Sequence, residues 1–367
     1  MSAIVIHLGD RKAGSTAIQY ALAAGAVRAP GLRIGYAAPI NHVPLARAMA
    51  DPAEARHRAA RLARALAPAR DGSADVTVIS AEDFEVVDPR VLRDALAAHA
   101  PDLAGRIRLI AYVRPHAERL LSSWAERVKQ GHFLGTPDEM FDRVQQRSLL
   151  RYTPRFLLWR ETFGAAFTLR PMIRDRLKGR DVVADFVDFA LEGAPFDLAD
   201  PPAANESLTL ADLALLRALH LRLRPGIRPG KASHAQKALG WVFARLLAGA
   251  PRPSGGTRPA LHAALARRVQ AACAADAAAL DAAFFADLGR PMTEALAQAG
   301  ARAVAEPQSI RAEDHYGPAA LRLLDAWTWV VAEMLKADPE GWPAFFVSRE
   351  RAFLRERRAG RDGGGAD

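Results

Sequence analysis

Apolar runs and helical patterns alternate along the first half of the chain. Short apolar runs predict buried strands near 3–8, 32–36, 76–80, 107–113 and 166–170. Apolar positions at helical spacing predict helices near 15–26, 43–66, 89–100, 116–131, 137–159 and 182–191. Because strands alternate with helices, we expect an α/β fold with a parallel sheet covered on both faces, and ligands at the carboxyl ends of the strands.

The pattern changes after residue 192. Beyond a turn-rich stretch, the sequence predicts helices over almost its whole length, at 208–223, 233–249, 258–287, 291–300, 315–337 and 341–357. We therefore expect an α/β core over 1–192, a helical part of the same domain over 193–300, a helical extension over 301–357 and a disordered tail over 358–367. In the extension, helical spacing predicts burial, against the core or a second subunit, of Leu321, Leu324, Trp327, Val331 and Leu335.

The first predicted strand leads into a loop whose residues suit an anion. Lys12, Gly14, Ser15 and Thr16 lie where the following helix begins. The first turn of a helix has unpaired N–H groups and a partial positive charge, so a phosphate or sulfate group binds there readily. The spacing differs from the Walker pattern, because Lys12 comes two residues before Gly14. The alternative is a serine that only caps the helix, with a chance lysine nearby.

A second segment places an arginine at a strand end and a serine on the helix that follows. Arg114 follows the predicted strand 107–113, and Pro115 suits the first turn of the next helix. Ser122 lies eight residues after Arg114, two helical turns on. The planar guanidinium group can bond two phosphate oxygens at once. The alternative is an ordinary charged start of a helix.

Together the two motifs resemble those of sulfotransferases that use 3′-phosphoadenosine 5′-phosphosulfate (PAPS), in particular a bacterial branch similar to Golgi carbohydrate sulfotransferases. The resemblance covers roughly residues 3–290 and is loose outside the two motifs. It implies a three-layer core of the P-loop nucleotide-kinase-like type, with PAPS as cofactor and no metal. It also implies transfer of a sulfuryl group to an acceptor hydroxyl, by default on a carbohydrate. Two departures are Pro115 directly after Arg114, and Arg11 where many relatives have proline.

The resemblance assigns roles to particular residues. The cofactor's 5′-phosphosulfate group would be bound by Arg11, Lys12, Ala13, Gly14, Ser15 and Thr16, and its 3′-phosphate by Arg114 and Ser122. Lys12 would stabilise charge on the leaving phosphate. As the base we rank Glu82, at a strand end, above His42, in a loop before a helix. A salt-bridged carboxylate and an exposed loop histidine are the respective alternatives, and His7 is expected to pack against the sheet.

Composition narrows the range of partners. A net charge of +9 favours anionic ligands, whereas no basic run with interleaved aromatic residues indicates nucleic acid. We expect a cytoplasmic protein, because no signal peptide precedes the first strand and no apolar run is long enough to span a membrane. The single cysteine, Cys273, excludes an internal disulfide and suggests a reducing compartment. No His or Cys cluster has metal-ligand spacing, so no metal is expected.

Two other classes of function stay open at this point. A nucleotide-triphosphate kinase or hydrolase is one, since Val76–Asp83 loosely resembles a Walker B strand. A non-catalytic nucleotide-binding protein that retains the cleft is the other. Arg119, Lys129 and His132 are further candidates for the acceptor side, although a solvated helix face explains them equally well. A homo-oligomer formed through the C-terminal helices is also compatible with the pattern.

Overall fold

A five-stranded parallel sheet forms the centre of the α/β part. The computed structural model describes residues 2–199, 208–223, 231–250 and 256–338, and also 340–342, 344–345, 348–349, 351–352 and 355–356. The strands are β1 (Ala3–Leu8), β3 (Ile34–Gly35), β4 (Val76–Ala81), β5 (Ile107–Val113) and β6 (Phe167–Pro171), in the spatial order β3-β4-β1-β5-β6. The predicted α/β fold with a parallel sheet is therefore confirmed, and β1 lies at its centre.

Helices cover both faces of this sheet. Successive side chains of a strand point to opposite faces, so Ile4 and Ile6 join one apolar layer while Val5 joins the other. The Val5 side is covered by α1 (Ser15–Ala23) and α8 (Val182–Ala190). The other side is covered by α2 (Val43–Ala50), α3 (Arg58–Arg70), α4 (Pro89–His99), α5 (His116–Lys129) and α7 (Thr153–Phe163).

Two of the predicted helices are interrupted. The predicted helix 43–66 breaks after α2, because Asp51 is extended and Pro52 begins a short 3₁₀ segment before α3. The predicted helix 137–159 divides into α6 (Pro137–Gln146) and α7, with Ser148 between them in the left-handed region at φ 52°. A two-stranded antiparallel pair, β2 (Val27–Arg28) with β7 (Asp197–Leu198), was not predicted.

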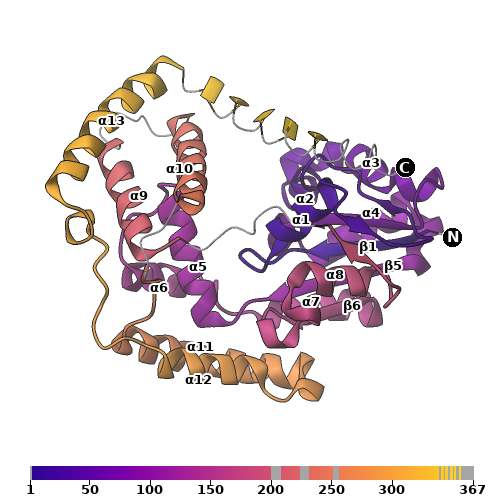
Figure 1. Cartoon of the computed structure of the whole chain (residues 1–367). Coiled ribbons are helices and arrows are strands. Elements are labelled where there is room, and N and C mark those ends of the chain that lie inside the picture. Colours follow the sequence, from indigo (N-terminus) through magenta and orange to yellow (C-terminus); the bar gives the residue numbers. More distant parts are fainter. Residues whose placement is uncertain are drawn as a thin grey trace.

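Helices dominate the described residues from 208 to 338, as the sequence predicts. They are α9 (Leu210–Leu223), α10 (Lys231–Gly249), α11 (Ala263–Phe284), α12 (Pro291–Ala301) and α13 (Pro318–Ala337). Figure 1 shows α9, α10 and α13 gathered at one end of the molecule, with the sheet at the other end and α11 beside α12. Helix α5 packs against α9, α10, α11 and α12, and so connects this part to the sheet.

Against the rest of the chain, α13 buries only some of the residues predicted to be buried. Leu324 and Leu335 are buried and Leu321 and Val331 are half-buried, whereas Trp327 is 61% exposed. The exposure of Trp327 rules out its burial against the core and leaves the predicted alternative of a second subunit. The covered stripe of α13 is centred on Leu324, Thr328 and Leu335, and Trp327 lies outside it on the helix surface. The predicted tail 358–367 lies outside the described residues, as does part of the predicted helix 341–357.

A buried carboxylate attaches α8 to the sheet. Asp185, on α8, accepts hydrogen bonds from the Tyr112 hydroxyl at 2.6 Å and from the Arg170 guanidinium at 2.7 Å. Tyr112 lies on β5 and Arg170 on β6. The backbone N–H of Lys178 donates to the same carboxylate at 2.9 Å. Asp185 therefore fixes α8 against two strands and the segment that follows β6.

Replacing Asp185 should test this attachment. Asp185→Ala leaves Arg170 and the Tyr112 hydroxyl without their buried partner, so we expect a loss of about 3 kcal/mol in the free energy of unfolding. The matched control is Asp188→Ala on the same helix, which removes only an exposed ion pair with Lys178 and should cost less than about 1 kcal/mol. Urea unfolding measures both. Equal losses would mean that the buried carboxylate adds nothing beyond a surface pair.

Candidate anion-binding site

The loop formed by residues 9–14 requires a glycine at its start. The Gly9 N–H donates to the Ala81 carbonyl at the end of β4, 3.0 Å away. A Cβ atom at Gly9 would lie 2.5 Å from the Ser15 hydroxyl and 2.8 Å from the Cα of Glu82. The end of β1, the start of α1 and the 3₁₀ segment η2 (Glu82–Val86) can therefore converge only around a residue without a side chain.

The N-terminus of α1 has the properties of an anion site. Gly14 precedes the helix with φ 85°, and no side chain of the described residues caps its first turn. The Ser15 hydroxyl is buried and has no hydrogen-bond partner there. Burying a polar group without a partner is costly, and the first-turn N–H groups add donors and positive charge. An anion at this end of α1 would satisfy these groups.

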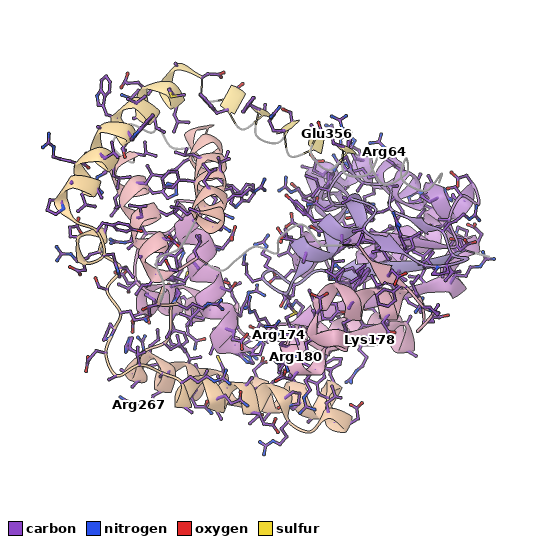
Figure 2. The ribbon with its side chains drawn as sticks, in the orientation of Figure 1. Arg64, Arg174, Lys178, Arg180, Arg267 and Glu356 are labelled. Carbon is purple, nitrogen blue, oxygen red and sulfur yellow. The ribbon has the colours of Figure 1, made fainter. Side chains whose placement is uncertain are left out.

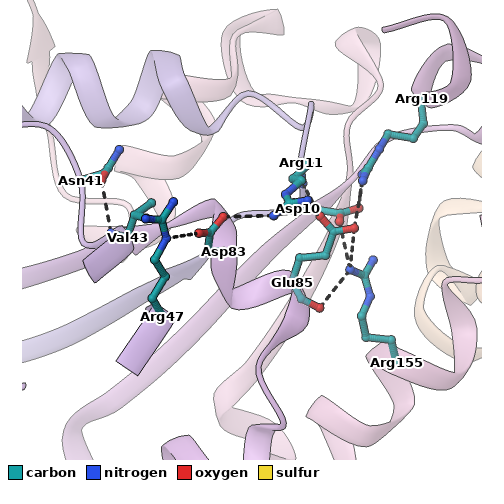
Figure 3. Close-up of polar contacts among 9 residues, drawn as sticks. All are labelled: Asp10, Arg11, Asn41, Val43, Arg47, Asp83, Glu85, Arg119 and Arg155. Carbon is teal, nitrogen blue, oxygen red and sulfur yellow. Dashed lines mark hydrogen bonds and ion pairs between the residues drawn. The ribbon is translucent and has the colours of Figure 1, made fainter. Parts of the chain in front are cut away.

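A buried cluster of ion pairs anchors the loop. Asp10 is only 1% exposed and pairs with Arg119 at 2.9 Å and with Arg155 at 3.1 Å. Glu85 of η2 pairs with the same two arginines, at 2.9 and 3.2 Å. Figure 3 shows the four side chains meeting from the loop, η2, α5 and α7. Burial raises the pKa of Asp10, but Arg155 and Arg119 lower it further, so the carboxylate stays charged.

Sequence reasoning missed most of this cluster. It considered Arg119 for the acceptor side and singled out neither Asp10 nor Glu85 nor Arg155. The contacts join residues between 34 and 145 positions apart, so no local spacing in the sequence indicates them. Only the folded chain shows that Arg119 points back into the protein.

Arg11 does not contribute its side chain to the start of α1. Its guanidinium group lies 3.3 Å from Asp83 and 3.8 Å from Glu85, and its side chain is 48% exposed. Asp83 also pairs with Arg47 at 3.2 Å, as Figure 3 shows. The positive charge of Arg11 is thus already matched by two carboxylates of η2.

The Lys12 ammonium group is held by a carboxylate on α5. Its Nζ lies 2.9 Å from Glu126, which also pairs with Lys129 at 2.7 Å. The Trp241 indole of α10 donates to the same carboxylate at 3.0 Å. Burial lowers the pKa of Lys12, partly opposed by Glu126. Burial would raise the pKa of Glu126, but Lys12 and Lys129 hold it well below its usual range. Neither Glu126 nor Trp241 was a candidate from the sequence.

Arg114 and Ser122 meet beside this loop. One guanidinium nitrogen of Arg114 donates to the Ser122 hydroxyl at 3.1 Å and to the backbone carbonyl of Lys12 at 3.0 Å. Glu118, one turn along α5, lies 3.5 Å from the same guanidinium. The structure therefore brings together the two motifs that the sequence singled out, at the carboxyl ends of β1 and β5.

The two candidate bases have different environments. Glu82 opens η2 directly after β4, and burial followed by repulsion from Asp83 raises its pKa above the usual range. His42 is buried, so the alternative of an exposed loop histidine is wrong. The His42 Nδ1 accepts from the Ser80 N–H at 3.2 Å, and burial lowers the pKa of its imidazole to about 4. His42 ties the start of α2 to the end of β4.

His7 lies in the same buried polar layer. It is fully buried, its Nδ1 lies 2.8 Å from the Ser80 hydroxyl, and burial lowers the pKa of its imidazole to about 3. Gln19 of α1 donates to the same hydroxyl at 3.2 Å. His7 thus packs within the sheet, as expected, next to Tyr112 and Phe186.

The segment after β6 adds exposed cations at the same sheet edge. Its two 3₁₀ turns, Arg174–Arg176 and Lys178–Arg180, lie between β6 and α8. Figure 2 labels Arg174, Lys178 and Arg180 among the surface side chains.

In the part of the chain that the structure describes, no three His, Cys, Asp or Glu side chains group as metal ligands. No described helix is long and apolar enough to cross a membrane.

The buried histidines should make stability depend on pH. The pKa values of His7 and His42 are about 3 and 4 in the folded protein, below the ordinary value of 6.5. The unfolded state therefore takes up protons first as pH falls. The free energy of unfolding is highest above about pH 6.5 and decreases towards pH 4, by up to about 1.4 kcal/mol per pH unit for each histidine. Thermal unfolding at pH 4.5 to 7.5 measures this. His42→Asn, whose side-chain oxygen can still accept from Ser80, should reduce the slope. An unchanged slope would contradict a neutral, buried His42.

The chain was also compared with known proteins. No family model, no curated protein and no solved structure matches it. A function therefore has to be inferred from the loop, the arginine–serine pair and the carboxylates around them.

Proposed function

We propose that this chain is a sulfotransferase that moves a sulfuryl group from PAPS to an acceptor hydroxyl, by default on a carbohydrate. The observation that carries the proposal is the contact of Arg114 with both Ser122 and the Lys12 backbone, next to the uncapped N-terminus of α1. Two anion-binding groups, 102 residues apart in sequence, thus lie side by side. A nucleotide with phosphate groups at both its 3′ and 5′ positions matches two such groups.

The fold proposed with this function is of the P-loop nucleotide-kinase-like type, with the helices after residue 208 as a C-terminal subdomain. In support, β1 is the central strand and the loop lies at its carboxyl end, where ligands bind in open parallel sheets. The unpartnered Ser15 hydroxyl supports the fit of the 5′ end, because a phosphate oxygen would supply the missing partner. We place the protein in the cytoplasm as part of the same proposal.

Each residue then has a role in the reaction. The first turn of α1, with Ser15 and Thr16, binds the 5′ end of the cofactor, while Arg114 and Ser122 bind the 3′-phosphate. PAPS supplies the activated sulfuryl group. Lys12, which pairs with Glu126, would stabilise negative charge on the leaving phosphate once that pair opens. Burial lowers the pKa of Lys12, and an anionic partner opposes this effect by favouring the charged ammonium group.

Among the nearby carboxylates, Glu82 is best suited to take the acceptor's proton. Its pKa is raised by burial, which makes it a stronger base near neutral pH. Glu126 also lies beside Lys12, but its pKa is far below the usual range, so it holds a proton poorly. The imidazole of His42 is buried behind β4 with a pKa of about 4, and we now assign it a supporting role.

The other nucleotide-binding classes receive less support. A Mg²⁺-dependent kinase or hydrolase would use a Walker loop, and the spacing of Lys12 and Gly14 does not fit that pattern. Asp83, in the segment that resembles a Walker B strand, is paired with Arg11 and Arg47. A non-catalytic binding protein would share the whole site except a functioning base. Turnover with any acceptor would exclude a non-catalytic binding protein.

Ligand binding tests the two anion-binding groups separately. Adenosine 3′,5′-bisphosphate should raise the melting temperature by mass action far more than 5′-AMP or ATP does. Arg114→Ala should weaken bisphosphate binding by about 1.5–3 kcal/mol, roughly ten- to a hundredfold, through loss of charged hydrogen bonds. Arg47→Ala, which removes a cation paired with Asp83 away from this site, is the control. Equal shifts with 5′-AMP and the bisphosphate would remove the role given to Arg114 and Ser122.

Turnover tests the assignment of the catalytic groups. Lys12→Ala should lower kcat by about 10²–10³-fold, because its contact strengthens as charge develops. Glu82→Gln should lower kcat by about 10²–10⁴-fold while bisphosphate binding stays unchanged. Glu126→Gln replaces the carboxylate that pairs with Lys12, and this variant should keep most of the turnover. If Glu126→Gln loses activity and Glu82→Gln keeps it, the base is Glu126 and our assignment is wrong.

A further inference from the structure

Helix α13 has a second apolar face that nothing in the described part of the chain covers. Six of its residues recur at spacings of three and four, the heptad pattern of a helix that packs against another helix. All six are exposed: Ala320, Leu323, Trp327, Val330, Met334 and Ala337. We call them the seam. The exposed fractions of Leu323 and Trp327 are 60% and 61%, and those of Val330 and Met334 are 40% each.

The seam is separate from the face that α13 uses inside the molecule. That inner face is formed by the buried residues Leu324, Thr328 and Leu335, of which Leu324 joins the apolar cluster shared with α9. The inner face therefore explains why α13 is helical and where it lies. It does not explain why six further apolar side chains repeat in register on a surface that faces water, where a monomer gains nothing from them.

The order of residues along the seam is self-complementary. In an antiparallel pair related by a two-fold axis midway between Trp327 and Val330, each of these two residues faces the other type on the second copy. Leu323 then faces Met334, and the small residues Ala320 and Ala337 face each other at the two ends. A symmetric contact of two identical patches requires this kind of match, because the same surface must complement itself.

Charges beside the seam match in the same arrangement. Arg322 and Glu333 lie on the same side of the seam, and both are exposed. The two-fold axis brings Arg322 of one copy alongside Glu333 of the second, within ~3 Å along the helix axis at a rise of about 1.5 Å per residue. On this side the centre of the contact is flanked by Ala326, so no like charges meet there. Two symmetric ion pairs would therefore border the apolar contact.

The size of the seam fits a reversible dimer. Covering the exposed parts of the six side chains on both copies buries on the order of 1,000 Å², the lower limit for a specific interface. Figure 1 shows the chain after α13 leading away from that helix, towards the end of the molecule that holds the sheet. The described residues that follow α13 therefore do not fold back to cover the seam.

We propose that α13 pairs with α13 of a second copy of this chain, antiparallel and two-fold symmetric along the seam. The loop and the carboxylates of the anion site lie on other elements, so each copy keeps its own site. This proposal is independent of the function inferred for that site.

Sedimentation of the full chain over a range of micromolar concentrations tests the proposal. The wild-type protein should pass from monomer to dimer as concentration rises. Trp327→Glu places a charge in the seam and should raise the dissociation constant more than tenfold. Trp329→Glu is the matched control, because Trp329 is even more exposed, at 69%, but lies outside the seam. It should leave the dissociation constant within about twofold.

Exchanging the two charged residues beside the seam tests the antiparallel orientation of the paired helices. Arg322→Glu and Glu333→Arg should each weaken the dimer, and the double variant should restore it, since the pairs re-form with reversed charge. Because both residues are exposed and Glu333 loses only an exposed pair with Lys336, the variants should stay close to the wild-type melting temperature at low concentration. A wild-type protein that stays monomeric, a dimer lost with Trp329→Glu but kept with Trp327→Glu, or a double variant no better than the single ones would each overturn the proposal.

Discussion

The pairing of Asp10 with Arg119 and Arg155 is the constraint on which the site depends. Two residues of the following loop segment, Lys12 and Gly14, have φ values of 69° and 85°, and a non-glycine residue in this region is strained. Such a backbone persists only where its surroundings hold it. Asp10 supplies that hold, because its carboxylate is buried between arginines from α5 and α7. Losing it would leave two buried guanidinium groups short of a partner, a cost of about 3–5 kcal/mol.

Helix α5 organises the other side of the site. Arg119, Ser122 and Glu126 are spaced by three and four residues, so they lie on one face of the helix and point towards the loop. Arg119 holds Asp10, Ser122 meets Arg114, and Glu126 holds Lys12. The opposite face, including Leu120, Trp124 and Val128, is buried in the core. One amphipathic helix thus positions a structural ion pair, one member of the candidate anion-binding pair and the partner of the candidate catalytic lysine.

The sequence predicts those features that have a local pattern. Periodicity predicted the parallel sheet and most helices. The resemblance to sulfotransferases, through the spacing of eight residues, singled out Arg114 and Ser122, which meet in the structure. It missed the break at Asp51–Pro52, where an extended residue and a proline interrupt an otherwise helical pattern. It also missed Glu85, Arg155, Glu126 and Trp241. The contacts that bring them to the site join residues between 34 and 145 positions apart, and a single charged residue on a helix looks the same in the sequence whether it is solvated or paired.

The central claim is that this loop and the Arg114–Ser122 pair bind one nucleotide phosphorylated at both ends. A crystal structure of the protein with adenosine 3′,5′-bisphosphate tests it most directly. We expect the 5′-phosphate at the N-terminus of α1 within hydrogen-bond distance of Ser15, the 3′-phosphate on Arg114 and Ser122, and the Lys12 ammonium moved away from Glu126. A nucleotide bound elsewhere, or a Lys12–Glu126 pair left intact with the nucleotide in place, would contradict the claim.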